Sequence, residues 1–406
     1  MKRTITNILF LLLSFTTFGQ STPTEIIEIN SKIFGGTRKV RINIPNDYAQ
    51  YPNRSYKVVY FFDAQNESFY NFTYETLKYM YDGLNIYIEP VIFVGIMTSN
   101  RQFEFLPKNK TGQPLKDYWE TVKLGGADSL AISLRDEVFP LIKSKYRCSG
   151  YNIAIGHSLG GSFITYTLTK YPELFNAIIA VSPNYYYDNG QLLTIFDSLA
   201  TSRLLDKKFL YVAYGKGDKL EERFRYSTMR FNDILKKKNF TGLNWEVQSL
   251  DNDSHATTPM EGFFKGFYKF SKALTVDDAL AETFAKDKSK DYIDNLKTYY
   301  NTQSIATGIK LPTINDINRL AYNSFYANKK TEGIKILEWG VSLYSDSNLF
   351  DSLGEMQQDL GNIKDAKSSY LEGLKIIESQ KPSLLPATYK DKFDWFTGRV
   401  KSTEQK

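Results

Sequence analysis

The sequence predicts an α/β protein in which a mostly parallel sheet with helices on both faces is followed by an all-helical region. Three observations support this fold class. Strand-like and helix-like segments alternate from residue 24 to about residue 275, the middle strands are continuous apolar runs, and strand signals stop after residue 276. Continuous apolar runs are typical of strands buried on both faces. A chain of 406 residues has room for two or three domains, and 42% hydrophobic residues exclude wholesale disorder.

The first part of the chain carries the strand signals. Two short alternating runs, at 25–30 and 38–44, predict an early hairpin. Further strands are expected at 57–62, 91–96, 151–155, 176–181, 208–214 and 243–249, and helices at 127–146, 161–171, 220–238 and 259–274. Alternation of this length predicts a mostly parallel sheet covered on both faces.

Beyond residue 276 the sequence predicts helices only. One helix is expected over 277–300, and an internal repeat with a constant offset of 33 residues follows it. Leu320-Ala321, Gly333, Leu337 and Gly340 match Leu353-Gly354, Ala366, Tyr370 and Gly373. This pattern of small and large residues resembles the tetratricopeptide repeat, and another bundle of helical hairpins is the alternative. We therefore predict an α/β domain over 24–275 and a tetratricopeptide-like domain over 276–400.

The N-terminus is typical of a signal peptide over residues 1–19. Lys2 and Arg3 precede the apolar run 8–15, and Thr17 and Gly19 place small residues before a cleavage site. The run is too short to cross a bilayer, and no apolar run elsewhere approaches 18 residues. The sequence thus predicts an exported protein, periplasmic or secreted, that does not span a membrane.

Charge and cysteine content exclude several classes of function. The formal net charge is +6, which is weak for a nucleic-acid-binding protein, where a clustered basic face is expected. A single cysteine, Cys148, excludes an internal disulfide and cysteine-based zinc or iron–sulfur sites. The sequence has no P-loop, dinucleotide-binding or metal-binding motif. We expect no cofactor and no metal, a small-molecule substrate, and a possible protein partner for the helical region.

The strongest chemical signal is a G-x-S-x-G motif at Gly156–Gly160. It lies directly between the strand expected at 151–155 and the helix expected from Gly161, which is the context of a nucleophile elbow. Such a turn forces Ser158 into a strained conformation and presents its hydroxyl at the carboxyl edge of the sheet. Ser158 is therefore the candidate nucleophile.

A serine hydroxyl needs a base and an acid to become an effective nucleophile. The chain has two histidines: His157 is inside the elbow, which leaves His255 as the base. The fold class that uses this elbow runs in the order Ser, Asp or Glu, His. Asp218, just past the strand at 208–214, is the preferred acid. Its close rivals are Glu221 and Glu222, and its weaker ones are Asp251 and Asp253.

An oxyanion hole needs two backbone N–H groups. Leu159, the residue after the nucleophile, is expected to supply one. The second is expected from the loop after the strand at 57–62, from Gln65 with Ala64 as its rival. Asp63 in the same loop is interpreted as a structural turn residue.

Several segments together resemble the esterase family that includes enterochelin and other ferric-siderophore esterases, and esterase D. The matching pieces are residues 58–64, 94–96, 100–101, 104–107, 137–140, 146, 156–161 and 182–184. The similarity covers roughly residues 28–272. It implies an α/β-hydrolase fold and cleavage of carboxylic esters through an acyl-enzyme.

The composition of the loops around the site suggests a substrate class. The long insertion at 97–126 contributes Arg101 and several aromatic residues, and Tyr185 and Tyr186 follow another strand. Together they are expected to form an aromatic wall with one guanidinium, which suits an aromatic, anionic or metal-chelate ester. Ordinary loop packing is the alternative.

We therefore predict an exported serine esterase with a Ser158–Asp218–His255 triad. An acyltransferase on the same fold and a non-catalytic, repeat-tailed binding protein are the alternatives. The sequence does not identify the ester, the oligomeric state or the partner of the helical tail.

Overall fold

The computed structural model describes residues 24–404 apart from 53, 84–88, 111–123, 200–204, 275–277, 288, 290 and 308–310. Within them, one eight-stranded sheet has the order β1-β2-β4-β3-β5-β6-β7-β8. Its strands are β1 (Glu25–Ser31), β2 (Gly36–Asn43), β3 (Tyr56–Phe62), β4 (Val91–Ile96), β5 (Cys148–His157), β6 (Ala177–Val181), β7 (Lys208–Gly215) and β8 (Leu243–Leu250). β2 runs antiparallel to both of its neighbours, and the pairs from β4 to β8 are parallel. The predicted fold class is confirmed.

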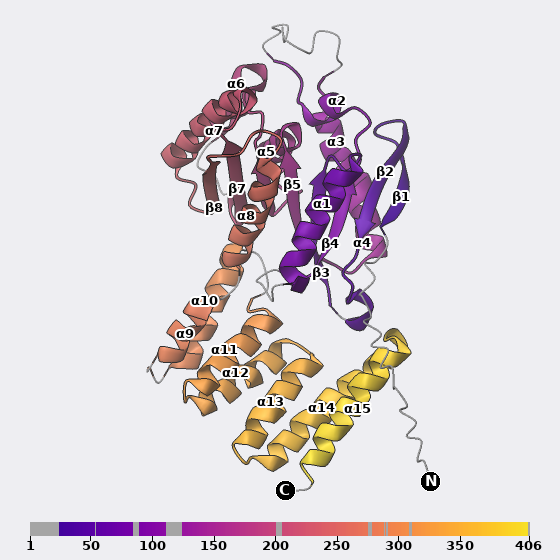
Figure 1. Cartoon of the computed structure of the whole chain (residues 1–406), viewed down its shortest axis with the longest axis vertical. Helices are drawn as coiled ribbons and strands as arrows, with labels where there is room; N and C mark the ends of the chain where they lie inside the picture. The colour runs from indigo at the N-terminus through magenta and orange to yellow at the C-terminus, as the bar shows by residue number, and fades with distance from the viewer. Residues whose placement is uncertain are drawn as a thin grey trace, which may run out of the picture.

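Helices cover both faces of the sheet (Figure 1). They are α1 (Glu67–Lys78), α2 (Arg101–Phe105), α3 (Ala127–Ser133), α4 (Phe139–Lys145), α5 (Leu159–Lys170), α6 (Tyr187–Ser198), α7 (Lys219–Lys238) and α8 (Thr258–Lys272). Alternate residues of the strands point to opposite faces. Val59 and Phe61 pack with α1 and α8 in one core, whereas Val58, Tyr60 and Phe62 pack with α3 to α7 in a second core.

The C-terminal part of the described chain is helical. It comprises α9 (Asp278–Lys286), α10 (Tyr292–Thr307), α11 (Ile314–Tyr326), α12 (Lys330–Leu343), α13 (Ser347–Asp359), α14 (Ile363–Gln380) and α15 (Pro386–Ser402). α13 and α14 begin 33 residues after α11 and α12. A Cβ at Gly354 would lie 2.4 Å from the Tyr370 ring, so a small residue is needed where α13 meets α14. The tetratricopeptide assignment and the domain boundary near residue 275 stay predictions.

The helical tail lies at the amino ends of the parallel strands (Figure 1). A cavity of about 480 Å³ there is lined by Lys57 and Ser149 from the sheet and by Ile314 and Tyr344 from the tail. The sheet's carboxyl edge is at the other end of β5, roughly 30 Å away at the usual rise per residue of a strand. The tail and any site at the carboxyl edge therefore lie at opposite ends of the strands.

Two helical predictions differ from the structure. The helix expected at 127–146 contains a π-helical turn at Leu134–Val138, which ends two residues before Pro140. Pro140 has no N–H to donate to the preceding turn, so the regular ladder is interrupted there. The region expected as one helix over 277–300 contains two, α9 and the start of α10. None of the described helices is long and apolar enough to span a bilayer.

Candidate active site

The G-x-S-x-G motif forms the predicted sharp turn between β5 and α5. Ser158 has φ 57° and ψ −120°, and its N–H donates to the carbonyl of Val181 at 2.9 Å. A positive φ at a non-glycine residue costs of order 1–3 kcal/mol, and such strain clusters at functional sites. A Cβ on Gly156 would lie 2.5 Å from the backbone carbon of Gly160, so the turn requires glycine there.

Replacing Gly156 by alanine is expected to destabilise the elbow. Because the new methyl group would meet backbone, it cannot be accommodated by a side-chain rotation, and we expect a loss of about 1–3 kcal/mol in the free energy of unfolding. Denaturant unfolding of Gly156→Ala measures this. Gly36→Ala is the matched control, because a Cβ there has no neighbour within 4 Å. Equal stability of the two variants would contradict the tight turn.

The carboxylate that contacts the candidate base, His255, is that of Glu221. His255 Nδ1 donates to Glu221 Oε1 at 2.5 Å, and Glu221 Oε2 accepts the backbone N–H of Gly215 at 2.7 Å. The Glu221 side chain is fully buried. Both carboxylate oxygens therefore have a donor, and one of them fixes which ring nitrogen of His255 carries the proton. The other ring nitrogen is left as the acceptor that a general base needs.

The prediction that Asp218 is the acid holding the ring of His255 is corrected at the contact: the ring bonds to Glu221, and Asp218 bonds only to the His255 backbone. Asp218 is the N-cap of α7: its Oδ1 accepts the backbone N–H of Glu221 at 2.8 Å, and its Oδ2 accepts the backbone N–H of His255 at 2.9 Å. Burial opposes the shift, but these N–H groups hold the pKa of Asp218 below its ordinary value. The rival Glu222 is exposed on α7.

The turn after β7 and the loop that carries His255 are bonded to each other. The backbone N–H groups of Lys216 and Gly217 both donate to the carbonyl of Asp253, at 3.0 and 2.8 Å. A Cβ on Gly217 would lie 2.7 Å from the backbone nitrogen of Ser254. The close contact of these two loops brings Glu221 and His255 together.

The structure shows which partners surround the candidate oxyanion donors. Leu159 is the first residue of α5, where the backbone N–H groups have no partner within the helix. The N–H of Ala64 donates to the carbonyl of Ile96 at 3.1 Å, so this rival is already engaged. Gln65 is exposed, and its side chain bonds to Asp63 and to the backbone of Thr98. This geometry favours Gln65 over Ala64.

The expected substrate-binding wall is only partly present. Arg101 makes a two-pronged ion pair with Asp63, at 2.7 and 3.0 Å, and its guanidinium also donates to the carbonyl of His157 at 3.4 Å. Tyr185 is a core residue whose hydroxyl bonds to Thr165, which corrects its assignment as a wall residue. Tyr186 is 58% exposed.

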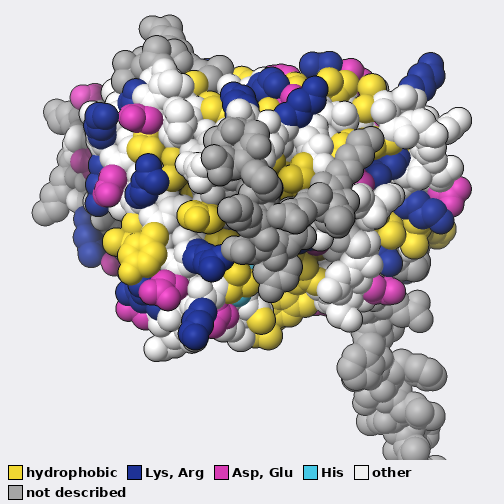
Figure 2. Space-filling view, turned by 90° about the horizontal axis from the view of Figure 1, so that it is seen from above, with side chains coloured by type: hydrophobic (Ala, Val, Ile, Leu, Met, Phe, Trp, Pro, Cys, Tyr) yellow, Lys and Arg dark blue, Asp and Glu magenta, His cyan; other side chains and the backbone are white. Residues whose placement is uncertain are grey.

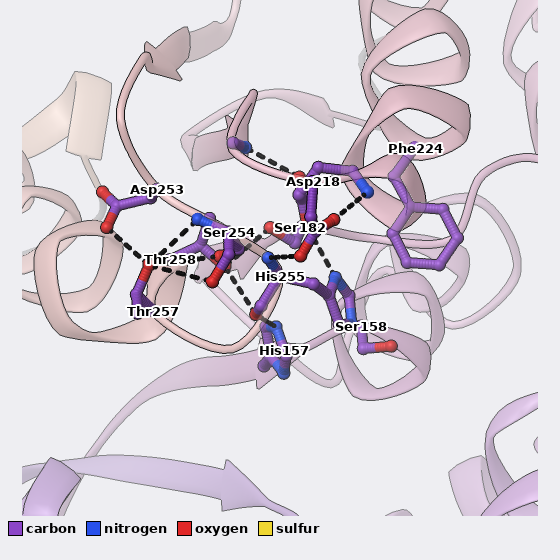
Figure 3. A network of polar contacts seen from close by, with 12 residues as sticks. His157, Ser158, Ser182, Asp218, Phe224, Asp253, Ser254, His255, Thr257 and Thr258 are labelled. Atoms are coloured by element: carbon purple, nitrogen blue, oxygen red, sulfur yellow. Dashed lines mark hydrogen bonds and ion pairs between the residues drawn. The ribbon is translucent and has the colours of Figure 1, made fainter.

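His157, which the sequence left without a role, contacts the candidate base His255. Its Nε2 donates to the carbonyl oxygen of His255 at 2.9 Å, and the two ring centroids are 4.5 Å apart. In the view of Figure 3, His255 lies between Asp218 and His157, with Ser158 beside it. Figure 2 shows histidine reaching the surface at one small point, next to hydrophobic side chains. Among the described residues no cluster of three or more His, Cys, Asp or Glu side chains could hold a metal ion.

Comparison with protein families gives one match. Residues 31–219 match the model of the family described as "Putative esterase". The matched segment includes the elbow and Asp218, and it ends before Glu221 and His255. No curated protein sequence matches the chain.

Solved structures share the fold. A structure titled IroE-like serine hydrolase from Shewanella oneidensis is 23% identical, with a TM-score of 0.66, over 78% of this chain and 98% of that one. An uncharacterised protein from Capnocytophaga ochracea is 15% identical, with a TM-score of 0.62, over 94% and 100%. A siderophore hydrolase, EstA from Aspergillus nidulans, is 19% identical, with a TM-score of 0.50, over 61% and 94%. The Capnocytophaga match extends the shared fold into the helical tail.

Proposed function

We propose that Ser158, Glu221 and His255 form the catalytic triad of this chain. The premise is that residues 31–219 belong to the esterase family and that the chain is a carboxylic ester hydrolase. The observation that carries this proposal is the contact between His255 Nδ1 and the buried Glu221 carboxylate, beside a strained nucleophile elbow. This is the geometry of an oriented base next to a serine.

The proposed reaction proceeds through an acyl-enzyme. His255 Nε2 takes the proton of the Ser158 hydroxyl as its oxygen attacks the ester carbonyl. The resulting oxyanion accepts hydrogen bonds from the backbone N–H groups of Leu159 and Gln65. His255 then gives the proton to the departing alcohol, and a water activated by the same base releases the acid and frees Ser158. Glu221 stabilises the imidazolium in both halves of the cycle.

A panel of chromogenic nitrophenyl esters tests the activity. The same panel with an added acceptor alcohol separates hydrolysis from acyl transfer, since a transferase would form the new ester in preference to the free acid. We expect the free acid to dominate. A chain that binds esters without turnover would instead be the repeat-tailed binding protein.

A siderophore-type or aromatic ester is the proposed substrate class. Its support is the family resemblance, the fold shared with a siderophore hydrolase, and the exposed ring of Tyr186. Export is part of the same proposal. The expected signal peptide, residues 1–19, lies outside the described residues, and N-terminal sequencing of protein recovered outside the cytoplasm tests for a new end at Gln20.

Arg101→Ala is expected to lower kcat/KM by the same factor for a catecholate ester and for a short-chain nitrophenyl ester. The reason is that Arg101 is committed to Asp63 in the loop that carries Gln65. Loss of a charged hydrogen bond of this kind costs about 1.5–3 kcal/mol. Steady-state kinetics on the two esters measures the effect. A loss confined to the catecholate ester would show that Arg101 binds the substrate directly.

A further inference from the structure

The carbonyl group of the candidate base is bonded to the residue that precedes the nucleophile. His157 Nε2 lies 2.9 Å from the carbonyl oxygen of His255, and a carbonyl can only accept, so Nε2 carries the proton. We propose that His157, together with Thr258, is a positioning residue that holds His255 by its own carbonyl and so sets its distance from Ser158. This inference rests on the proposed function and deepens it.

The His157 ring has the right protonation state for this task. Burial, and then the neighbouring His255 and Arg101, hold the pKa of His157 well below its ordinary value. The ring is therefore neutral at pH 7, with one N–H, and that N–H is committed to His255. A neutral ring 4.5 Å from His255 also adds no charge that would oppose the imidazolium formed during turnover. Phe69 packs edge-on against the His157 ring at 6.0 Å and helps to fix its orientation.

Thr258 supplies the second donor to the same oxygen. Its hydroxyl donates to the His255 carbonyl at 3.1 Å and accepts a hydrogen bond from the Ser182 hydroxyl at 2.8 Å. Thr258 and Ser182 are both fully buried. The chain of contacts joins the end of β6, the start of α8 and the elbow to one carbonyl oxygen (Figure 3).

The opposite side of the same residue is held more weakly. The backbone N–H of His255 donates to Asp218, which is exposed, so water can replace that bond. On the carbonyl side, Thr258 is fully buried and the His157 ring is half-buried, so water replaces these donors less readily. His255 follows β8 in a segment without helix or strand, so these bonds, together with the bond from its ring to the buried Glu221, decide where its ring lies.

The effect on rate follows from the geometry that proton transfer needs. The base must be within about 2.6–3.2 Å of the hydroxyl whose proton it takes. A displacement of about 1 Å in a catalytic constellation can cost on the order of 10²-fold in rate. Loss of the carbonyl anchor should therefore lower kcat and leave substrate binding unchanged.

The experiment compares His157→Met with His157→Gln on a 4-nitrophenyl ester. Methionine has a similar volume without a donor, and the glutamine amide places an N–H near the position of Nε2. We expect kcat to fall about 10²-fold in His157→Met with KM unchanged, and His157→Gln to recover about tenfold of that loss. Thr258→Val, which keeps the His157 ring, should lower kcat by about tenfold.

Thr165→Val is the matched control, because it removes a buried hydroxyl from α5 that bonds to Tyr185 and does not contact His255. We expect its kcat to equal that of the wild type, and thermal melting checks that each variant is folded. Wild-type kcat in His157→Met, or equal losses in all four variants, would overturn the proposal. If His157→Met does not fold, an unchanged kcat in Thr258→Val overturns it. Failure of the proposed function has a different signature, which is no turnover by the wild type or full turnover by Ser158→Ala.

Discussion

Ser158→Ala is expected to lower kcat/KM for any ester substrate by about 10⁴–10⁶-fold and to leave the fold intact. The hydroxyl oxygen is the group that forms the bond to the acyl carbon, and no other side chain at the elbow can replace it. The fold should persist because the backbone bond from Ser158 to Val181 does not involve the hydroxyl. Steady-state kinetics and circular dichroism of the purified variant measure the two expectations.

Three further variants complete this test. His255→Ala should match the loss in Ser158→Ala, and the double variant should add little, since the two residues act as a unit. Thr167→Val is the control. It removes a buried hydroxyl of α5 that donates to the carbonyl of Ile164, and its turnover should equal that of the wild type. Substantial turnover by Ser158→Ala would exclude this serine as the nucleophile.

The strands of the sheet were predictable because their sequence pattern has one physical cause. A strand covered by helices on both faces must be apolar at every position, as Val91–Ile96 is. The helix α1 was missed for the opposite reason. Its buried stripe consists of Tyr70, Thr73, Tyr74 and Leu77, at helical spacing, but only Leu77 is aliphatic. Tyrosine and threonine do not stand out as core residues until their neighbours are known.

The sequence singles out Ser158 as the candidate nucleophile and His255 as the candidate base for two different reasons. The elbow is a local motif, so its strand and helix are visible in the sequence around Ser158. The candidate base follows by elimination, because a chain with two histidines offers one candidate outside the elbow. Neither argument needs knowledge of a long-range contact.

Asp218 and Glu221 are hard to tell apart from the sequence because one aspartate has a competing local use. Asp218 comes directly before α7, and aspartate is among the preferred N-cap residues, where its oxygen accepts a helix N–H. Glu221 is the third residue of that helix, so it points back over the turn toward the loop of His255. The spacing of a helix-capping pair, Asp218 and Glu221, was the signal that could have separated the two roles.

The aromatic wall failed at Tyr185 because burial in a loop depends on distant elements. Tyr185 packs under α5 and against Phe231 of α7, with ring centroids 4.8 Å apart, while the next residue, Tyr186, is exposed. Three consecutive tyrosines give no periodicity from which to choose. Arg101 has the same difficulty, because its partner Asp63 is 38 positions away in the sequence.

Glu221→Gln is expected to lower kcat/KM by about 10⁴-fold, because the neutral amide no longer stabilises the imidazolium or selects the correct tautomer of His255. Asp218→Ser is the matched variant. Serine is also a good N-cap, so it can keep the bond to the Glu221 N–H while losing the one to the His255 N–H. We expect about a tenfold loss for Asp218→Ser, the scale of one net hydrogen bond.

Asp218 is expected to stay ionised above about pH 5 in the wild type. The pKa of Asp218 is lowered in the folded state, so its two bonds persist above the ordinary carboxyl pKa of about 4 and are lost only as the pH falls further. Steady-state kinetics at pH 6, 7 and 8 measures both variants under conditions in which Asp218 of the wild type stays ionised. A 10⁴-fold loss in Asp218→Ser with near-normal turnover in Glu221→Gln would return the role of the acid to Asp218. It would also mean that the His255 loop moves before the reaction, because in this geometry Asp218 bonds only to the backbone N–H of His255.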